Sequence, residues 1–238
     1  MELTKICDGL DFPEGPIAMA DGSIILVEIR RQTLSRVTPD GAIDVIAHLG
    51  GGPNGAAVGP DGMIYVCNNG GFVWTQKEGI TRPVGTPEDY VSGSIQRVDP
   101  ATGDFETIYE SCNGTPLRGP NDIVFDAEGG FYFTDLGKAN ADYMHHGAFY
   151  YAKIDGSHIR RVHSPMITAN GIGLSPDGKT VHVAETRTGR VWSFDLIGAG
   201  EIGPLPFNMP GRLLCTLPDY QLLDSLAVQA DGTICVAT

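Results

Sequence analysis

Short apolar stretches separated by glycine-containing turns recur along the whole chain. The clearest copy covers residues 169–183 and runs from an amide through a short apolar strand and an Asp-Gly turn to a second, alternating strand. The same order occurs four more times, led by Glu14, Asn54, Asn121 and Asp224. In all five copies, the leading polar residue stands eight positions before the turn glycine. This self-similarity predicts an array of equivalent structural units.

A second pair of short strands follows the first in most units. In the first unit the expected strands cover 17–19, 24–28, 33–37 and 43–47, and no convincing helical pattern interrupts any unit. The leading residues are spaced by about 52 positions on average. Four antiparallel strands per unit of this length are typical of a β-propeller, in which blades stack in a ring because no blade buries both faces alone.

The number of units predicts how the ring is composed. Five first strands are visible, and the fifth unit ends after its second strand, near residue 237. A ring of six blades would need roughly 60 to 70 further residues at the observed period. We therefore expect an all-β propeller of the six-bladed type, with residues 1–238 forming a single domain that is C-terminally incomplete. A five-bladed ring is the alternative.

Composition and charge limit the binding partners and the cellular compartment that we expect. The chain has 29 acidic and 16 basic residues, a net charge of −13, which disfavours nucleic acid and suits a hard metal cation. The five cysteines are odd in number and lack CxxC spacing, so we expect reduced, mostly buried thiols in a cytoplasmic protein. No secretory run or membrane-spanning stretch is visible, so no membrane partner is expected.

The repeat also predicts where the polar residues meet. The first strand of each propeller blade lines the central channel, so residues in one register lie at one end of that channel. Glu14, Asn54, Asn121, Asn170 and Asp224 should therefore point toward one another. Their oxygens suit Ca²⁺ best, then Mg²⁺ or Mn²⁺, with Zn²⁺ disfavoured, and two facing carboxylates are costly without a cation. Each residue alone reads as a turn former, but five in one register favour a site.

Several motifs carry a resemblance to a known family. They are Phe12-Pro13-Glu14-Gly15-Pro16, Gly119-Pro120-Asn121-Asp122-Ile123-Val124 with Phe133-Thr134-Asp135, Ala169-Asn170-Gly171 with Ser175-Pro176-Asp177-Gly178, and Asp224-Ser225. In these motifs the chain resembles the SMP-30/gluconolactonase/luciferin-regenerating-enzyme family of six-bladed propellers. The resemblance covers essentially the whole chain.

The resemblance implies a divalent metal, usually Ca²⁺, at the channel floor. The family pattern makes Glu14, Asn170 and Asp224 direct ligands, with Asn121 as a fourth that binds directly or through water or substrate. Asp224 is also implied as the base that activates water. Arg118 resembles a substrate-contacting arginine of the family, and we place it with Asn121 and Asn54 among the substrate-binding residues, although Asn54 has no assigned family role.

The expected activity is metal-assisted hydrolysis of a small-molecule lactone, and the resemblance favours a sugar-acid lactone. The cation would polarise the ring carbonyl while Asp224 takes a proton from the attacking water. Two alternatives stay open. The same ligands would serve a phosphotriesterase-like calcium propeller, and a non-catalytic propeller would bind protein or peptide on one face.

Overall fold

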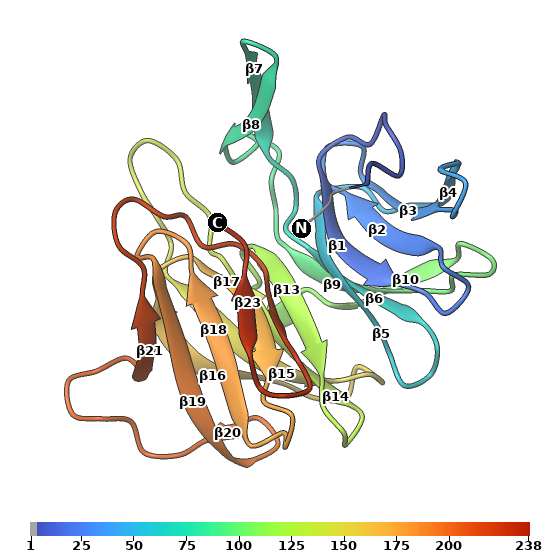
Figure 1. The fold of residues 1–238 in the computed structure, drawn as a ribbon. Helices are drawn as coiled ribbons and strands as arrows, with labels where there is room; N and C mark the ends of the chain where they lie inside the picture. The colour runs from blue at the N-terminus through green and yellow to red at the C-terminus, as the bar shows by residue number, and fades with distance from the viewer. Residues whose placement is uncertain (1–3) are drawn as a thin grey trace.

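The computed structural model describes residues 4–238, and every regular element in that part of the chain is a β-strand (Figure 1). The strands form four antiparallel sheets that follow one another along the chain, and then a two-stranded hairpin. Figure 1 shows the first sheet on the right and the fourth on the left, with strand β13 of the third sheet between them. The all-β prediction is confirmed.

Each sheet is built mainly from consecutive strands. The first contains β1 (Pro13–Ala18), β2 (Ile24–Glu28), β3 (Thr33–Val37) and β4 (Ile43–His48). The second contains β5 (Pro53–Val58), β6 (Ile64–Asn68), β9 (Ser94–Val98) and β10 (Phe105–Tyr109). The third contains β13 (Pro120–Phe125), β14 (Gly130–Asp135), β15 (Gly147–Lys153) and β16 (Ile159–Met166).

The fourth sheet has an irregular outer edge. It contains β17 (Ala169–Leu174), β18 (Thr180–Glu185) and β19 (Arg190–Gly198), and β19 pairs with both β20 (Glu201–Ile202) and β21 (Arg212–Thr216). The last hairpin joins β22 (Leu226–Val228) to β23 (Ile234–Val236). Two small hairpins complete the described chain, β7 (Val73–Lys77) with β8 (Ile80–Gly85), and β11 (Ser111–Cys112) with β12 (Thr115–Pro116).

The apolar core lies between successive sheets. Along β14, Phe131 and Phe133 pack with residues of the second sheet, whereas Tyr132 packs with Trp192 and Phe194 of the fourth sheet. Successive side chains of a strand point to opposite faces, so β14 buries both of its faces. This arrangement explains why the second strand of each sheet reads as an almost continuous apolar run.

The first strands of neighbouring sheets lie side by side, in the order β1, β5, β13, β17 and β22. Glycine permits the close approach. A Cβ atom on Gly55 would lie 2.3 Å from the backbone oxygen of Asn121, and one on Gly171 would lie 2.4 Å from the backbone nitrogen of Leu226. Each of these glycines directly follows a leading polar residue of the repeat, so the closest packing occurs beside those residues.

Replacing Gly55 with alanine is expected to destabilise the protein by about 1–3 kcal/mol, as overpacking commonly does. The new methyl group meets a backbone carbonyl of the next sheet, which cannot swing aside as a flexible side chain would. Urea unfolding measures the change. Gly85→Ala is the matched control, because a Cβ atom there meets open space, and equal effects of the two variants would contradict this account.

Two local expectations need correction. The alternating apolar residues at 3–7 predict a short strand, but no strand forms over 4–7, and residue 3 lies outside the described residues. The long excursion at residues 75–91 of the second unit forms most of the β7–β8 hairpin that projects from the second sheet (Figure 1). All five cysteines are free, but only Cys67 and Cys112 are buried.

One further finding concerns membranes. Among residues 4–238, no helix is long and apolar enough to cross a bilayer.

Candidate metal centre and its pockets

The leading polar residues occupy equivalent positions. Glu14, Asn54, Asn121 and Asn170 are each the second residue of the first strand of their sheet, and Asp224 stands two residues before β22. The three asparagines are buried, Glu14 is half-buried and Asp224 is exposed. The structure thus places four of them at the start of their strands and Asp224 just before the start of β22.

A β-bulge or similar irregularity follows the leading residue in each of the four sheets. The pairing register shifts between Glu14 and Ile17, and the corresponding shifts occur at the start of β5, β13 and β17. A bulge re-aims a side chain and locally ends the ladder of hydrogen bonds. Because the bulges share one position, the leading residues of all four sheets depart from the regular side-chain alternation of a strand at the same place.

Asn170 offers an acceptor without a partner. Its Nδ2 donates a hydrogen bond to Oγ1 of Thr186 at 3.1 Å, which leaves Oδ1 as the free atom. That oxygen is buried and accepts no hydrogen bond from the described residues. Leaving a buried acceptor unsatisfied costs about 1–3 kcal/mol, so this oxygen is suited to an external partner.

Three carboxylates lie within electrostatic reach of one another. The pKa of Glu14 is raised to about 7, mainly by burial and also by the charges of Asp224 and Asp122. Burial also raises the pKa of Asp122 to about 7, again with a contribution from the charge of Asp224. Crowded carboxylates of this kind are stabilised by a cation between them.

Asp122 was not among the residues predicted from the sequence to form the site. It directly follows Asn121, at the position that glycine occupies in three other repeats as Gly15, Gly55 and Gly171. Its Oδ1 accepts a hydrogen bond from the backbone of Ile123 at 3.1 Å. A carboxylate in place of a packing glycine was a signal available in the aligned repeats.

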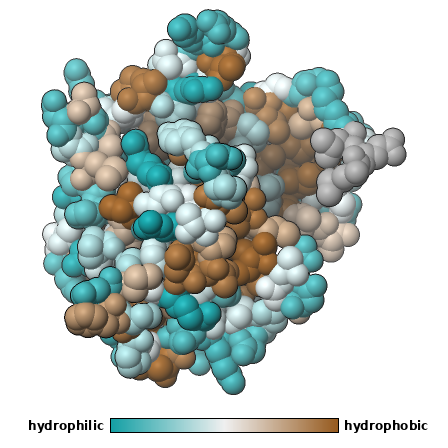
Figure 2. Space-filling view, turned by 60° about the vertical axis from the view of Figure 1, so that its left-hand side comes forward, coloured by the Kyte–Doolittle hydropathy of each residue, from teal (hydrophilic) through white to brown (hydrophobic). Residues whose placement is uncertain are grey.

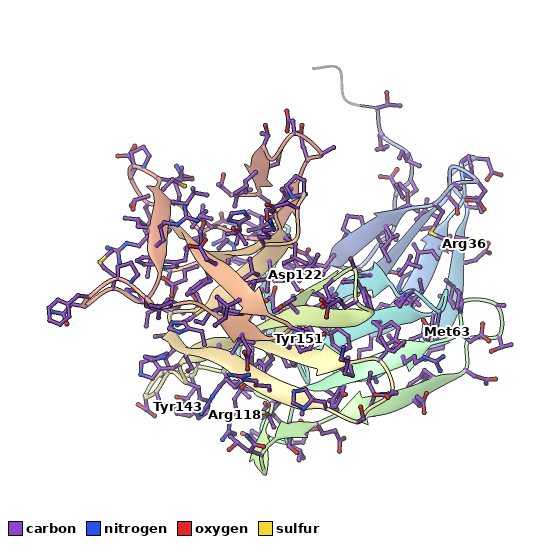
Figure 3. All side chains as sticks on the ribbon, turned by 90° about the horizontal axis from the view of Figure 1, so that it is seen from below. Arg36, Met63, Arg118, Asp122, Tyr143 and Tyr151 are labelled. Atoms are coloured by element: carbon purple, nitrogen blue, oxygen red, sulfur yellow. The ribbon has the colours of Figure 1, made fainter. Side chains whose placement is uncertain are left out.

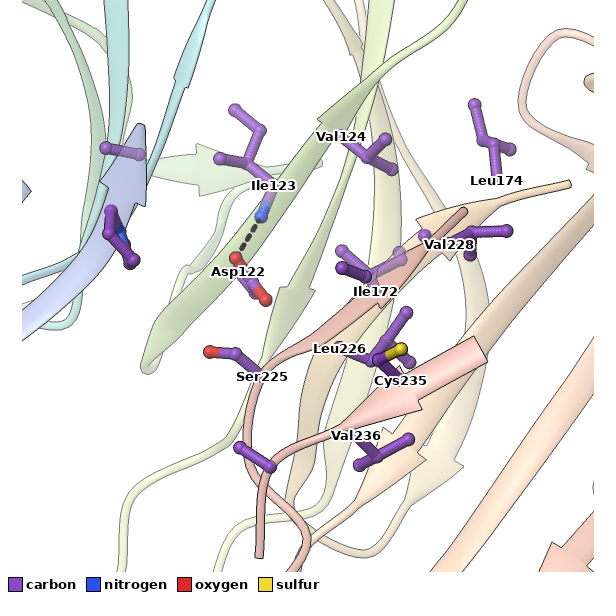
Figure 4. A pocket seen from close by; sticks show the side chains of 16 residues that line it. Asp122, Ile123, Val124, Ile172, Leu174, Ser225, Leu226, Val228, Cys235 and Val236 are labelled. Carbon is purple, nitrogen blue, oxygen red and sulfur yellow. Dashed lines mark hydrogen bonds between the residues drawn. The ribbon is translucent and has the colours of Figure 1, made fainter. Parts of the chain in front are cut away.

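Two pockets flank the leading residues. The first, of about 540 Å³, is lined by residues of β1, β13, β17 and the last hairpin, including Asp122 and Ser225 (Figure 4). Its walls are mainly apolar, and Figure 2 shows apolar side chains exposed in a hollow of the surface. The second, of about 390 Å³, is lined by Asn170 and Thr186. Asn170 lines the second pocket, whereas the first is lined by neighbours of the leading residues, Gly15, Asp122 and Ser225.

Arg118 and Asn54, the other two predicted substrate-binding residues besides Asn121, do not line either pocket. The backbone N–H of Arg118 donates to Oδ2 of Asp135 at 2.7 Å, and its carbonyl oxygen accepts a hydrogen bond from the Tyr90 hydroxyl. In Figure 3, Arg118 is separated from Asp122, which lies near the centre of the molecule. Their contact with substrate stays a prediction.

The donor atoms fit a hard cation. Within the described chain, no group of three or more His, Cys, Asp or Glu side chains has the arrangement of a metal site. The candidate set instead mixes carboxylates with amides, and all its donors are oxygen atoms, the ligands that Ca²⁺ prefers. The unpartnered Oδ1 of Asn170 and the raised pKa of Glu14 fit such an ion. Glu14, Asn121, Asn170 and Asp224 remain the predicted ligands.

In each of the four sheets, a buried side chain accepts a hydrogen bond from the backbone just before the leading residue. The last residue of the second strand is Glu28, Asn68, Asp135 or Glu185 in the four sheets. Each accepts a hydrogen bond from a backbone N–H two or three positions before a leading residue, at 2.6–2.8 Å. The same type of hydrogen bond therefore holds the segment that leads into the first strand in all four sheets.

Asp135→Asn is expected to destabilise the protein by about 1–3 kcal/mol, because an amide N–H₂ would face backbone N–H donors in a buried position. Asp135 accepts hydrogen bonds from the N–H groups of Arg118, Gly119 and Gly137. Chemical denaturation measures the loss. Asp142→Asn at an exposed loop position is the control, and an Asp135 variant as stable as that control would show that these hydrogen bonds are unimportant.

The fold and the candidate site define a class: an all-β protein of repeated antiparallel sheets with oxygen donors collected at one end of their first strands. The chain belongs to a family within that class. The family model described as the SMP-30/Gluconolactonase/LRE-like region matches residues 12–238. The predicted resemblance is confirmed.

Relatives of known name support the same family. A gluconolactonase of Zymomonas mobilis is 24% identical over 218 residues, covering 82% of this chain and 55% of that protein. The lactonase drp35 of Staphylococcus saprophyticus is 29% identical over 240 residues, covering 100% of this chain and 65% of that protein. The chain thus spans between 55% and 65% of the length of these two relatives.

Solved structures show the same fold. A gluconolactonase from Xanthomonas campestris superposes with a TM-score of 0.72 at 23% identity, covering 95% of this chain and 69% of the other. A calcium-binding regucalcin from Agrobacterium tumefaciens gives a TM-score of 0.67 at 18% identity, covering 95% of this chain and 67% of the other.

Proposed function

We propose that this protein hydrolyses a lactone with the help of one divalent cation, Ca²⁺ in the first place. Two observations carry the proposal: the charges of Asp122 and Asp224 act on Glu14, and the buried Oδ1 of Asn170, at the same position of the repeat as Glu14, has no partner. Relatives named gluconolactonase and lactonase support the reaction class, and they favour a sugar-acid lactone as substrate.

The proposal extends to the architecture. The four sheets are blades of a β-propeller of the six-bladed type, and the last hairpin begins a fifth blade. The sequential order of the strands and the neighbouring first strands support this assignment. Among the described residues, no sheet closes the ring between the last hairpin and β1.

The residues of the site would share the work. Glu14, Asn121, Asn170 and Asp224 would hold the cation, which when bound polarises the lactone carbonyl and stabilises negative charge on its oxygen. Asp224 would also take a proton from the attacking water, since one carboxylate oxygen can act as base while the other holds the metal. The bulges and the buried acceptors orient these side chains.

A pH-indicator assay on a panel of lactones tests the proposal. We expect hydrolysis with Ca²⁺, loss of activity with a chelator, and recovery when the ion is returned. Mg²⁺, Mn²⁺ and Zn²⁺ are tested in parallel, and phosphotriesters are included because the same ligands would serve them. If none of these ions supports turnover of any lactone, the proposed function is wrong.

A further inference from the structure

Most of the second pocket is built from four separate segments. They are the end of the β7–β8 hairpin at residues 83–86, the insertion at residues 136–144, the loop after β18 and the segment before β22. Asn170 contributes to the wall of the same pocket. A molecule held at Asn170 would therefore have room to extend into this space.

The charge of this pocket is opposite to that of the protein. Lys138 and Arg187 line it, and no Asp or Glu is among its lining residues, although the chain carries 29 acidic and 16 basic residues. Neither cation forms an ion pair with any carboxylate that the structure describes. The carboxylate of Asp135, outside the pocket wall, is within electrostatic reach of Lys138. Two basic side chains and no acidic one in the wall, in an acidic protein, still indicate a site for negative charge.

Lys138 is held where its charge is poorly solvated. Its side chain is only 3% exposed, and Nζ donates to the backbone oxygen of Gly71 at 2.6 Å and to Oδ1 of Asn69 at 3.3 Å. The ammonium group lies 4.3 Å from the ring centroid of Phe72 and 5.0 Å from that of Tyr90. A lysine has three donor hydrogens, so one is left for a ligand.

Arg187 stands at the rim, next to a residue that orients Asn170. Its backbone N–H donates to Oγ1 of Thr168 at 2.9 Å, and the preceding Thr186 accepts the hydrogen bond from Nδ2 of Asn170. The guanidinium group itself is exposed and makes no hydrogen bond to the described residues. A planar guanidinium binds carboxylate or phosphate oxygens with two parallel hydrogen bonds.

We propose that the second pocket receives an anionic substituent of the lactone, a carboxylate or a phosphate, which Arg187 and Lys138 bind. The inference rests on the proposed lactone hydrolysis, because it names the substrate class of that same site. Apolar side chains such as Phe72, Val84 and Leu222 would cover the carbon skeleton between the two ends.

Thermal unfolding of the full chain in excess Ca²⁺ tests the inference without turnover. D-glucose, D-glucuronate and D-glucose 6-phosphate share one ring and differ in charge. We expect the anionic rings to raise the melting temperature and glucose to leave it unchanged. The larger of the two anionic shifts distinguishes carboxylate from phosphate.

Arg187→Gln is expected to weaken binding of the anionic rings on the order of tenfold, the effect of losing one charge-assisted hydrogen bond. Arg82→Gln is the matched control, since Arg82 is exposed on the neighbouring hairpin and does not line the pocket. In the activity assay, Arg187→Gln should reduce kcat/KM for a 6-phosphorylated gluconolactone more than for gluconolactone itself.

The outcomes separate the two proposals. Equal shifts with glucose and the anionic rings, no shift with any of them, or an Arg187→Gln variant that binds like the Arg82→Gln control would each overturn the anionic pocket. Anion-dependent shifts without hydrolysis of any lactone would support the pocket and refute the proposed reaction. Hydrolysis of neutral lactones alone, without such shifts, would do the reverse.

Discussion

Replacing Asp224 with asparagine is expected to lower kcat for lactone hydrolysis by about 10²–10⁴-fold, the usual contribution of a general base. The amide keeps an oxygen for the cation but cannot take a proton from water. The melting temperature should therefore still rise on addition of Ca²⁺. Steady-state kinetics and calcium titration of the same preparation measure the two effects separately.

Asp231→Asn is the control for this experiment. Asp231 belongs to the same unit, but it lies in the β22–β23 turn and accepts a hydrogen bond from the backbone of Thr233. A normal rate in the Asp224 variant would show that another group is the base. Loss of both turnover and the calcium response would show that the carboxylate of Asp224 is required to hold the ion, which contradicts the expected outcome.

Without bound metal, the contribution of Glu14 and Asp122 to stability is expected to fall as the pH rises from about 4 to about 7. Both groups have a pKa raised to about 7 in the folded protein, from ordinary values of 4.5 and 3.8. In this window the folded state binds more protons than the unfolded state, so raising the pH favours unfolding. Ca²⁺ reverses the effect where the carboxylates are ionised.

Saturating Ca²⁺ should therefore raise the melting temperature more at pH 8 than at pH 5. An ion present at a thousandfold excess over its Kd stabilises a protein by about 4 kcal/mol. Glu14→Gln should lose part of the pH dependence measured in chelator. An identical calcium response at both pH values, with Glu14→Gln indistinguishable from the parent, would count against these carboxylates as the metal site.

The local repeat allowed the first strands to be predicted, but not every outer strand. Turn glycines and alternating apolar residues mark β1, β5, β13 and β17 because these strands are bounded by short-range signals. Strand β21 gives no such signal, since all five of its residues are exposed and its pairing with β19 spans a long loop. An exposed edge strand that pairs over a long loop produces little alternation of apolar and polar residues in the local sequence.

The candidate site was predicted from residues that share one position in the repeat, and this explains why Asp122 was missed. Glu14, Asn54, Asn121, Asn170 and Asp224 were singled out because they share one position in the repeat, and the family resemblance implied four of them, without Asn54, as ligands. Asp122 stands one position later, where glycine in other units serves close packing, so the repeat itself drew attention away from it. The raised pKa of its carboxyl group depends on burial and on Asp224, a residue distant in sequence.

The β7–β8 hairpin interrupts the second sheet without disturbing it. Strands β6 and β9 flank the insertion and pair residue for residue, from Ile64 with Val98 to Asn68 with Ser94, with no shift. Changes in the length or composition of the inserted segment should therefore leave the pairing of β6 with β9 unchanged. The inserted segment can therefore change in evolution, and with it the wall of the second pocket, while the strands that carry the candidate site keep their pairing.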